Sequence, residues 1–393
     1  MTKLYKILMA STISLSLLLG GCNGALSPKN ENPGQSTVQS STAEGTQEDG
    51  SNSDEATIPA ENTGTSPQET GSDAGNQKDD QTVRPEIDLE KVKPNEAGKV
   101  MIVMFHRFIE KYESGDMEYV TTFDEFRNLL QTLYDKGYRL ISMKDFLNDN
   151  IDVPAGCVPM VFTFDDGTPG QFSLVEEDGK LVVNKKSAVG VMMEFYEQHP
   201  DFGLEGTFYV NLGGGTFEGG AGTLAEKLKY LIDLGFEIGN HTYNHVNLLN
   251  VKTAQEVQME LGANQKRMEE LVPGYKMETM ALPLGNSTGD KSLRNYLVQG
   301  EYEGAKYQNL ILLGVGADPT VTPININYGS LYTPRVRASG LKKVEMDLSW
   351  WLDNISRSQE YVSDGNPDTI TVPEEKKDEI DVSKLGNKKL ITY

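Results

Sequence analysis

Hydrophobic residues gather in short continuous runs from about residue 100 onward. Residues 100–105 (VMIVMF) are apolar throughout, as expected for a strand buried on both faces. Further short strands are predicted at residues 138–143, 160–164, 206–210, 236–239, 280–283, 310–315 and 331–336. Runs of this length and spacing indicate a sheet whose strands lie inside the folded region.

Helical patterns lie between several of these strands. Thr122 and Glu125 have the spacing of a capping box, and apolar residues then recur at helical intervals until Gly137. Residues 223–234, 253–271 and 344–352 also have helical patterns. Repeated strand-helix units favour an α/β fold with a parallel sheet, and their total length favours a barrel-like closure. Periodicity alone does not separate a barrel from an open sheet.

A hairpin is predicted between the third strand and residue 206. The apolar runs 172–175 and 181–183 flank Asp178-Gly179, a strong turn signal. We expect this hairpin to project from the strand ends that carry the chemistry and to form one wall of the site.

The first 21 residues have the pattern of a secretory signal peptide. Lys3 and Lys6 precede an apolar stretch at 7–19, which is too short to span a membrane. Leu19-Gly20-Gly21-Cys22 resembles a bacterial lipobox, which implies lipidation of Cys22 and a membrane contact through a lipid anchor. The alternative is an ordinary signal peptide followed by a chance cysteine. The lipobox predicts a lipoprotein on the extracellular face of the bacterial cell membrane.

Composition divides the rest of the chain. Residues 22–98 are rich in Ser, Thr, Gly and acidic side chains, which predicts a disordered tether. Residues 99–355 form the predicted folded domain, and residues 356–393 read as a polar tail without an assigned function. The formal net charge of -22 argues against nucleic-acid binding. With the Cys22 thiol lipidated, Cys157 is the only cysteine that remains, so no intramolecular disulfide is expected in the mature chain. We also expect a monomer.

Two short motifs carry the candidate chemistry. Asp165 and Asp166 follow a predicted strand in Thr-Phe-Asp-Asp-Gly, and His241 and His245 follow another in His-Thr-Tyr-Asn-His. Each motif alone has an ordinary alternative, a solvated turn or a pair of histidines without metal. Together, at strand ends and in a chain with four histidines, they predict a metal site with two imidazole ligands and a carboxylate.

At these residues the sequence resembles the NodB-type polysaccharide deacetylases, carbohydrate esterase family 4, over about residues 100–338. The resemblance implies a distorted (β/α)7 barrel. It also implies that Asp165 is the general base and that Asp166, His241 and His245 bind one divalent metal. Zinc is the first expectation, with cobalt, nickel or iron as alternatives.

The third family motif, R-x-P-[YF]-G, corresponds to residues 281–285, Ala-Leu-Pro-Leu-Gly. Its arginine and aromatic residue are absent, so the tuning of the Asp165 pKa has to come from elsewhere or be weaker. The main-chain N–H of Leu284 is the expected oxyanion donor, because such a donor does not depend on the side chain. Pro283, Gly285 and Tyr243 are expected to contact substrate. The fourth, aromatic-rich motif has no match near residues 312–316.

No histidine follows His245, so the family's C-terminal L-x-H motif is absent. Phe105-His106, after the first strand, resembles the Y-H motif of a permuted subgroup that deacetylates β-1,6-linked poly-N-acetylglucosamine. That resemblance implies that His106 is the general acid, and the alternative is a structural histidine.

These observations predict a metal-dependent hydrolase that removes N-acetyl groups from an acetylated glycan containing N-acetylglucosamine. The alternative is a catalytically weak or inactive glycan-binding lipoprotein that retains the deacetylase fold. Tyr332, Trp350 and Trp351 are further candidates for stacking on sugar rings, although a terminal helix predicts core packing for at least one tryptophan. Peptidoglycan, exopolysaccharide, chitin-like oligomers and acetylated xylan all remain candidate substrates.

Overall fold

The computed structural model describes residues 87–116 and 118–393. The predicted signal peptide, Cys22 and most of the predicted tether lie outside these residues. Among the described helices, none has the length and apolar character needed to cross a bilayer.

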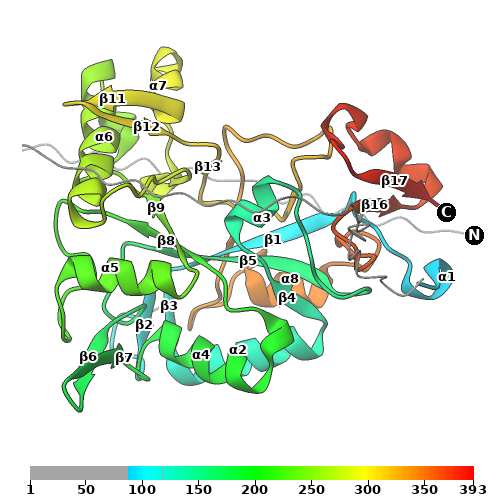
Figure 1. Ribbon diagram of the computed structural model, residues 1–393, viewed down its shortest axis with the longest axis horizontal. Coiled ribbons are helices and arrows are strands. Elements are labelled where there is room, and N and C mark those ends of the chain that lie inside the picture. Colours follow the sequence, from blue (N-terminus) through cyan, green and yellow to red (C-terminus); the bar gives the residue numbers. More distant parts are fainter. Residues whose placement is uncertain (1–86, 117) are drawn as a thin grey trace, which may run out of the picture. The chain divides into compact units, whose positions relative to one another are not determined.

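A central sheet runs through the folded region (Figure 1). Its main path consists, in spatial order, of β13 (Leu312–Leu313), β10 (Met280–Ala281), β9 (Glu237–Asn240), β8 (Thr207–Val210), β5 (Val158–Asp165) and β1 (Lys99–Phe105). Neighbours along this path are parallel. β4 (Tyr138–Leu140) pairs in parallel with β5, whereas β14 (Thr320–Val321) pairs antiparallel with β1 and makes the sheet mixed.

Residues 333–337 join the two ends of this path. Val336 of β15 (Val336–Arg337) pairs in parallel with Val103 of β1, and Thr333 forms a parallel bridge with Leu313 of β13. The same segment therefore pairs with the first and the last strand. The expected α/β fold with a distorted barrel closure is confirmed, and the pairing resolves the choice that periodicity left open.

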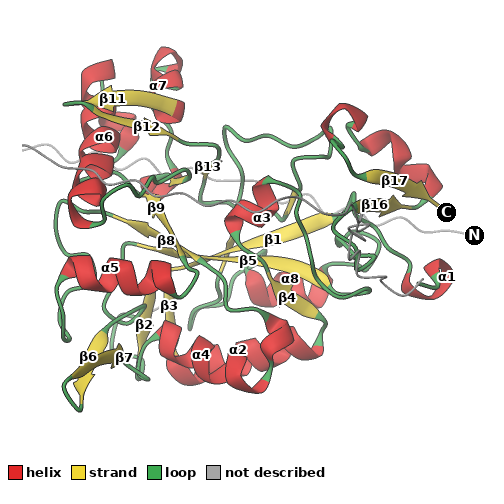
Figure 2. Ribbon diagram, viewed as in Figure 1, coloured by secondary structure: helices red, strands yellow, loops and turns green. Residues whose placement is uncertain are grey.

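Helices α2 (Phe123–Asp135), α4 (Ala188–Gln198) and α5 (Leu224–Asp233) cover one face of the sheet (Figure 2). Capping boxes begin α2, α5 and α6 (Ala254–Leu271), as the sequence predicts for α2. The predicted strand 138–143 ends early, because Ser142 caps the short helix α3 (Met143–Leu147). α8 (Leu348–Asn354) forms the later part of the predicted terminal helix.

The remaining elements are short. They are α1 (Leu89–Val92), α7 (Asn295–Val298), β2 (Arg107–Ile109), β3 (Val120–Thr122), β6 (Leu174–Glu177), β7 (Lys180–Val183), β11 (Gln299–Tyr302), β12 (Ala305–Gln308), β16 (Thr369–Val372) and β17 (Lys389–Thr392). β6 and β7 form the predicted hairpin, closed at Asp178-Gly179.

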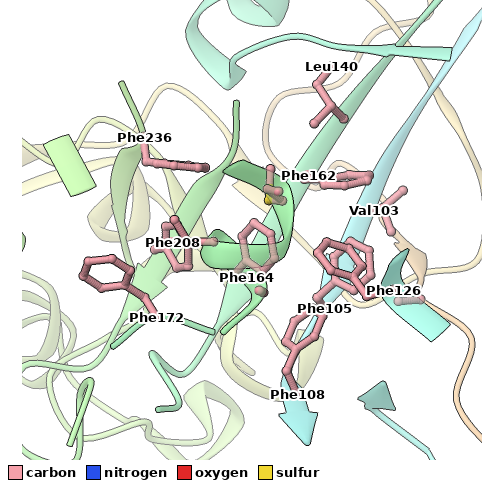
Figure 3. Packing of buried hydrophobic residues seen from close by; sticks show 14 of the residues in the cluster. Val103, Phe105, Phe108, Phe126, Leu140, Phe162, Phe164, Phe172, Phe208 and Phe236 are labelled. Carbon is pink, nitrogen blue, oxygen red and sulfur yellow. The ribbon is translucent and has the colours of Figure 1, made fainter. Parts of the chain in front are cut away.

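Aromatic side chains fill the core beneath the sheet (Figure 3). The rings of Phe164 and Phe208 stack with centroids 4.6 Å apart, and Phe105 contacts Phe162 and Phe126 edge-on. These rings alternate with polar residues at the strand ends, so the core fixes the direction in which β1 and β5 present their last residues.

The prediction of a polar tail at 356–393 and the tether boundary at residue 98 need correction. Strands β16 and β17 pair within the C-terminal segment, and Ile370, Val372 and Ile380 pack with Ala97 and Ile324. The buried Glu96 carboxylate accepts hydrogen bonds from the main chain of Thr371 (2.7 Å) and Asp364 (3.1 Å). A few apolar residues spread through charged sequence form this contact, and composition does not reveal them.

Candidate active site

The parallel pairing of β1 and β5 brings His106 and Asp165 to the same edge of the sheet. Phe105 pairs with Phe164, so the next residues of the two strands lie side by side. His106 Nε2 is 3.9 Å from Asp165 Oδ2. The carboxyl ends of parallel strands are where such folds build their sites, which agrees with this placement.

Asp166, His241 and His245 converge on one point. Asp166 Oδ1 lies 3.4 Å from His241 Nε2 and 3.3 Å from His245 Nε2, and one ligand atom from each residue lies within 4.8 Å of the others. Asp166 has a φ of 76°, a left-handed conformation that separates its side chain from that of Asp165. The side chains of Asp165 and Asp166 therefore lie in two different places, and the left-handed backbone at Asp166 replaces the extended backbone that the sequence suggested.

This donor set fits a divalent metal. Asp166 Oδ1 is buried and has no hydrogen-bond partner among the described residues, which is costly unless a cation compensates it. His241 Nδ1 is 2.7 Å from the Ala281 carbonyl oxygen, so this nitrogen carries the proton and Nε2 is left as the ligand atom. Two imidazoles and a carboxylate are a common three-residue set for catalytic zinc, and they also suit other transition metals.

Buried amides hold the histidine loop in an unusual conformation. Thr242 and His245 have φ values of 61° and 53°. Asn211 donates to the carbonyl oxygens of His241 and Thr242, and the Asn240 side chain accepts from the Thr242 main chain at 2.9 Å. Strained residues supported in this way are typical of functional sites, where the surrounding structure fixes a ligand's direction.

Arg335 replaces the missing motif arginine in contact with Asp165. Its two terminal nitrogens each lie 2.7 Å from a different Asp165 oxygen, and its Nε donates to the Gly314 carbonyl oxygen. The guanidinium is fully buried. Burial raises the pKa of Asp165, but the charge of Arg335 and its hydrogen bonds more than offset this and hold the pKa well below its ordinary value.

The sequence analysis did not identify Arg335, although one signal was present. It is a charged residue inside the predicted strand 331–336, and burial of a charged residue in a strand is unusual unless a partner carboxylate is buried beside it.

Gln171 is a second residue that the sequence analysis missed. Its buried side-chain nitrogen donates to the carbonyl oxygens of both His106 (2.5 Å) and Asp165. The Thr168 hydroxyl also donates to the His106 carbonyl oxygen, at 3.1 Å. These bonds tie the ends of β1 and β5 together and fix the spacing between the two candidate catalytic residues.

Residues 283–285 form a tight turn beside these groups. Leu284 has a φ of 57° and its side chain is 60 % exposed, whereas Pro283 is buried. Main-chain bonds from Gly285 to Leu282 and from Asn286 to Pro283 close the turn and do not involve the Leu284 N–H. This leaves that N–H as the candidate oxyanion donor that the resemblance implies.

An open cavity of about 390 Å³ contains His106, Asp165 and all three candidate metal ligands, and Tyr119, Leu284 and Val315 also line it. A neighbouring hollow of about 450 Å³ shares Asp166 and His245. The rest of its lining consists of Asn211, Gly213, Gly214, Tyr243 and Asn244.

No residue of the β6–β7 hairpin lines either cavity, so the expectation that this hairpin walls the site is wrong. The hairpin instead bridges to Ala221, and residues around β2 and β3 provide the wall.

The other candidate aromatic platforms lie outside both linings. The Tyr332 hydroxyl donates to the Val315 carbonyl oxygen at 3.1 Å, which places this half-exposed ring next to the main cavity. Trp351 is buried and its indole donates to the Ala317 carbonyl oxygen at 2.5 Å, and Trp350 packs against it. The tryptophans are therefore packing residues of α8.

Solved structures with a similar arrangement include two deacetylases and the protein IcaB. A polysaccharide deacetylase from Bacillus cereus is 19 % identical, with a TM-score of 0.47 over 65 % of this chain and 68 % of that one. The deacetylase PplD from Streptococcus pyogenes, solved with acetate, is 17 % identical, with a TM-score of 0.46 over 61 % and 92 %. IcaB from Ammonifex degensii is 19 % identical, with a TM-score of 0.43 over 63 % and 94 %.

A search of curated proteins finds no match. Residues 152–304 match the family described as polysaccharide deacetylase. The matched region contains Asp165, Asp166, His241, His245 and the 283–285 turn, whereas His106 and Arg335 lie outside it. In residues 152–304 this chain is therefore similar to the polysaccharide deacetylases, a family of hydrolases.

Proposed function

We propose that this protein uses a divalent metal to hydrolyse N-acetyl groups from a polysaccharide that contains N-acetylglucosamine. The observation that carries the proposal is the convergence of Asp165, Asp166, His241 and His245 at one cavity, with His106 at its edge. A protein that only binds glycan would need the cavity alone. It would not need the Asp165 carboxylate, paired with Arg335, beside a set of metal ligands.

Asp166, His241 and His245 would hold the metal, with zinc as the first candidate. Such a cation acts as a Lewis acid toward the acetyl carbonyl and makes water easier to deprotonate. The open cavity gives an acetamide group access to these three side chains.

Asp165 takes the role of general base. Its lowered pKa keeps the carboxylate ionised at neutral pH, after burial and the stronger opposing effect of Arg335 are both counted. The bidentate contact with Arg335 fixes the orientation of the carboxylate, so that it accepts a proton from water at a defined position. Arg335 would thus provide the tuning of the Asp165 pKa that the absent motif arginine cannot provide.

His106 takes the role of general acid, giving a proton to the nitrogen of the departing sugar amine. Burial lowers the pKa of His106, while the charges of Asp165 and Asp166 act in the opposite direction. The Leu284 N–H would stabilise the negative charge that develops on the carbonyl oxygen. The products are acetate and a glucosamine unit.

Acetate release from a panel of glycans tests the proposal. We would assay β-1,6-linked poly-N-acetylglucosamine, peptidoglycan, chitin oligomers and acetylated xylan with the metal-depleted full chain, adding zinc, cobalt, nickel or iron one at a time. We expect release from an N-acetylglucosamine polymer, with the β-1,6-linked polymer first because His106 follows β1 as in the permuted subgroup.

Matched variants separate catalysis from folding. Asp165→Asn is expected to keep its metal and lose turnover, and Asp166→Asn is expected to lose the metal. The alternative, a glycan-binding protein without catalysis, would be supported by glycan binding without acetate release under every metal. That result would overturn the proposed function.

We also propose a location at the cell surface, based on the lipobox-like sequence that ends at Cys22. Cells given a radiolabelled fatty acid should incorporate it into the parent chain and not into a Cys22→Ala variant. Equal labelling of the two proteins, or none of the parent, would contradict the proposal.

A further inference from the structure

We propose that Tyr119 is a positioning residue that holds the imidazole of His106 in its catalytic orientation. The inference rests on the proposed function, because it gives Tyr119 a role through the general acid of that reaction. Tyr119 itself belongs to none of the motifs that the sequence analysis identified.

Among the described residues, none forms a hydrogen bond that would orient the His106 ring. A catalytic imidazole is normally fixed by a hydrogen bond at the nitrogen that faces away from the reaction. His106 Nδ1 is buried, and no described residue offers it a hydrogen-bond partner. Asp165 Oδ2 is 3.9 Å from the other nitrogen, beyond hydrogen-bond distance. The orientation of this ring must therefore come from packing.

Tyr119 supplies that packing. Its ring meets the His106 ring edge-on, with centroids 4.8 Å apart and an interplanar angle of 62°. Both rings line the cavity that contains Asp165 and the candidate metal ligands. An edge-on aromatic contact of this kind restricts rotation of a partner ring about its side-chain bonds.

Tyr119 is in turn held by charged neighbours. The Arg337 guanidinium lies over the tyrosine ring at 5.2 Å from its centroid, and Glu118 accepts a hydrogen bond from Arg337 at 2.6 Å. Arg337 belongs to β15, the strand that closes the barrel against β1. The tyrosine ring therefore sits between the closing strand and the residue that follows β1.

The backbone conformation of Tyr119 is a further reason to assign its side chain a role. Its φ is 59°, a left-handed conformation that is unfavourable for a large side chain and easier for asparagine or glycine. The Tyr119 carbonyl oxygen accepts from the Arg107 main chain at 3.0 Å, which together with the β2–β3 pairing fixes this conformation. Backbone strain of this kind is tolerated when the surrounding structure fixes it and the side chain serves the site.

The test uses two substitutions of Tyr119 in two backgrounds. Tyr119→Asn removes the ring while suiting the left-handed backbone, so the variant should fold. Tyr119→Phe keeps the ring and removes only the hydroxyl. Each is made in the parent chain and in His106→Ala, and kcat and KM are measured by acetate release from the glycan that the parent deacetylates.

We expect Tyr119→Asn to lower kcat by about 10- to 100-fold with little change in KM, and Tyr119→Phe to retain parental kcat. In the His106→Ala background, Tyr119→Asn should have no further effect on residual turnover. An equal loss in both backgrounds, a change confined to KM, or failure of Tyr119→Phe to restore turnover would overturn the proposal. Each of these results would indicate direct contact with the glycan or a purely structural role.

Crystal structures of the two Tyr119 variants provide a readout that does not depend on activity. The proposal requires that the His106 ring turns or becomes disordered in Tyr119→Asn and stays at its parental distance from Asp165 in Tyr119→Phe. An unmoved His106 ring in Tyr119→Asn would overturn it. Absence of acetate release from the parent would instead contradict the proposed function, and the crystal structures would still decide the role of Tyr119.

Discussion

Arg335 and Asp165 form a bidentate ion pair inside the barrel, with two nitrogen-oxygen distances of 2.7 Å and both side chains almost completely buried. The two residues are 170 positions apart in the sequence. They come together because β15, which carries Arg337 and follows Arg335, pairs with β1, and β1 pairs with β5. Closure of the sheet thus brings Arg335 to Asp165.

Arg335→Met should destabilise the full chain by about 3 kcal/mol and abolish most turnover, because it leaves the Asp165 carboxylate buried without its cation. Urea unfolding measures the first effect, and acetate release measures the second. The double variant Asp165→Asn/Arg335→Met should recover more than half of the lost stability but no activity. Arg267→Met, which breaks an exposed ion pair with Glu270, is the control and should change stability by well under about 1 kcal/mol. If Arg335→Met and Arg267→Met changed stability and turnover equally, Arg335 would not be the residue that compensates the Asp165 charge.

Removal of metal should lower the thermal midpoint of the parent chain. A ligand that binds only the folded state at a hundredfold excess over its Kd stabilises by about 2.7 kcal/mol. We expect calorimetry of the parent with zinc, and then with a chelator, to show this loss. Asp166→Asn should show no shift, whereas Asp233→Asn, which removes an exposed carboxylate paired with Lys229, should respond like the parent. A chelator effect that survives in Asp166→Asn would place the metal elsewhere.

Glu96 should make stability fall as the pH rises. Burial, helped by the charge of Asp364, raises the pKa of Glu96 from 4.5 to about 8. Between these two values the folded chain keeps a proton on Glu96 that the unfolded chain has released, so raising the pH favours unfolding. The contribution should approach about 1.4 kcal/mol per pH unit between pH 5 and 8.

Urea unfolding of the full chain at several pH values tests this prediction against two variants. Glu96→Gln should be less stable at pH 5, because an amide NH2 group replaces one of the two oxygens that accept main-chain hydrogen bonds, and its stability should depend less steeply on pH. Glu375→Gln, at an exposed position, should keep the parental slope. A parental slope in Glu96→Gln would exclude Glu96 as the titrating group.

Gly285→Ala should lower both stability and turnover. A methyl group there would lie 2.6 Å from Val315 Cβ, and the φ of 69° also disfavours alanine, so the turn that carries Leu284 would have to move. Gly329→Ala is the matched control, because an added Cβ meets nothing within 4 Å. Thermal unfolding and acetate release should both separate the two variants. Parental turnover in Gly285→Ala would argue against a role for the 283–285 turn.

Local patterns predicted the elements and motifs that are continuous in the sequence. The apolar run at 100–105 became β1, the predicted capping box at Thr122 begins α2, and the two motifs meet at one edge of the sheet. Residues that reach the site from distant elements were not predicted. Arg335 precedes β15, Gln171 follows β5 and Tyr119 precedes β3, so these residues reach the site only when the three segments come together in the fold. These residues are far apart in the sequence, so the pattern of any one segment does not reveal that they lie close together in space.

The C-terminal segment shows a second reason why sequence patterns fail. Its charged composition hid the few apolar residues, Ile370, Val372 and Ile380, that pack with Ala97. Periodicity arguments need several apolar residues in one stretch, whereas this packing joins single residues from separate stretches. This packing becomes apparent only when the C-terminal segment and the residues before β1 are seen together in the structure.

The contact between Glu96 and Thr371 also has a mechanical consequence. Residues 94–97 precede β1 and His106 follows it, so the upstream chain and the catalytic cavity are joined to opposite ends of this seven-residue strand. A pull applied to the chain before residue 94 meets the hydrogen bond from Tyr393 to Pro94 first, and then those from Asn95 to Val362 and from Glu96 to Thr371. The C-terminal strands would absorb that load before it strained the loops that hold His106 and the candidate metal ligands.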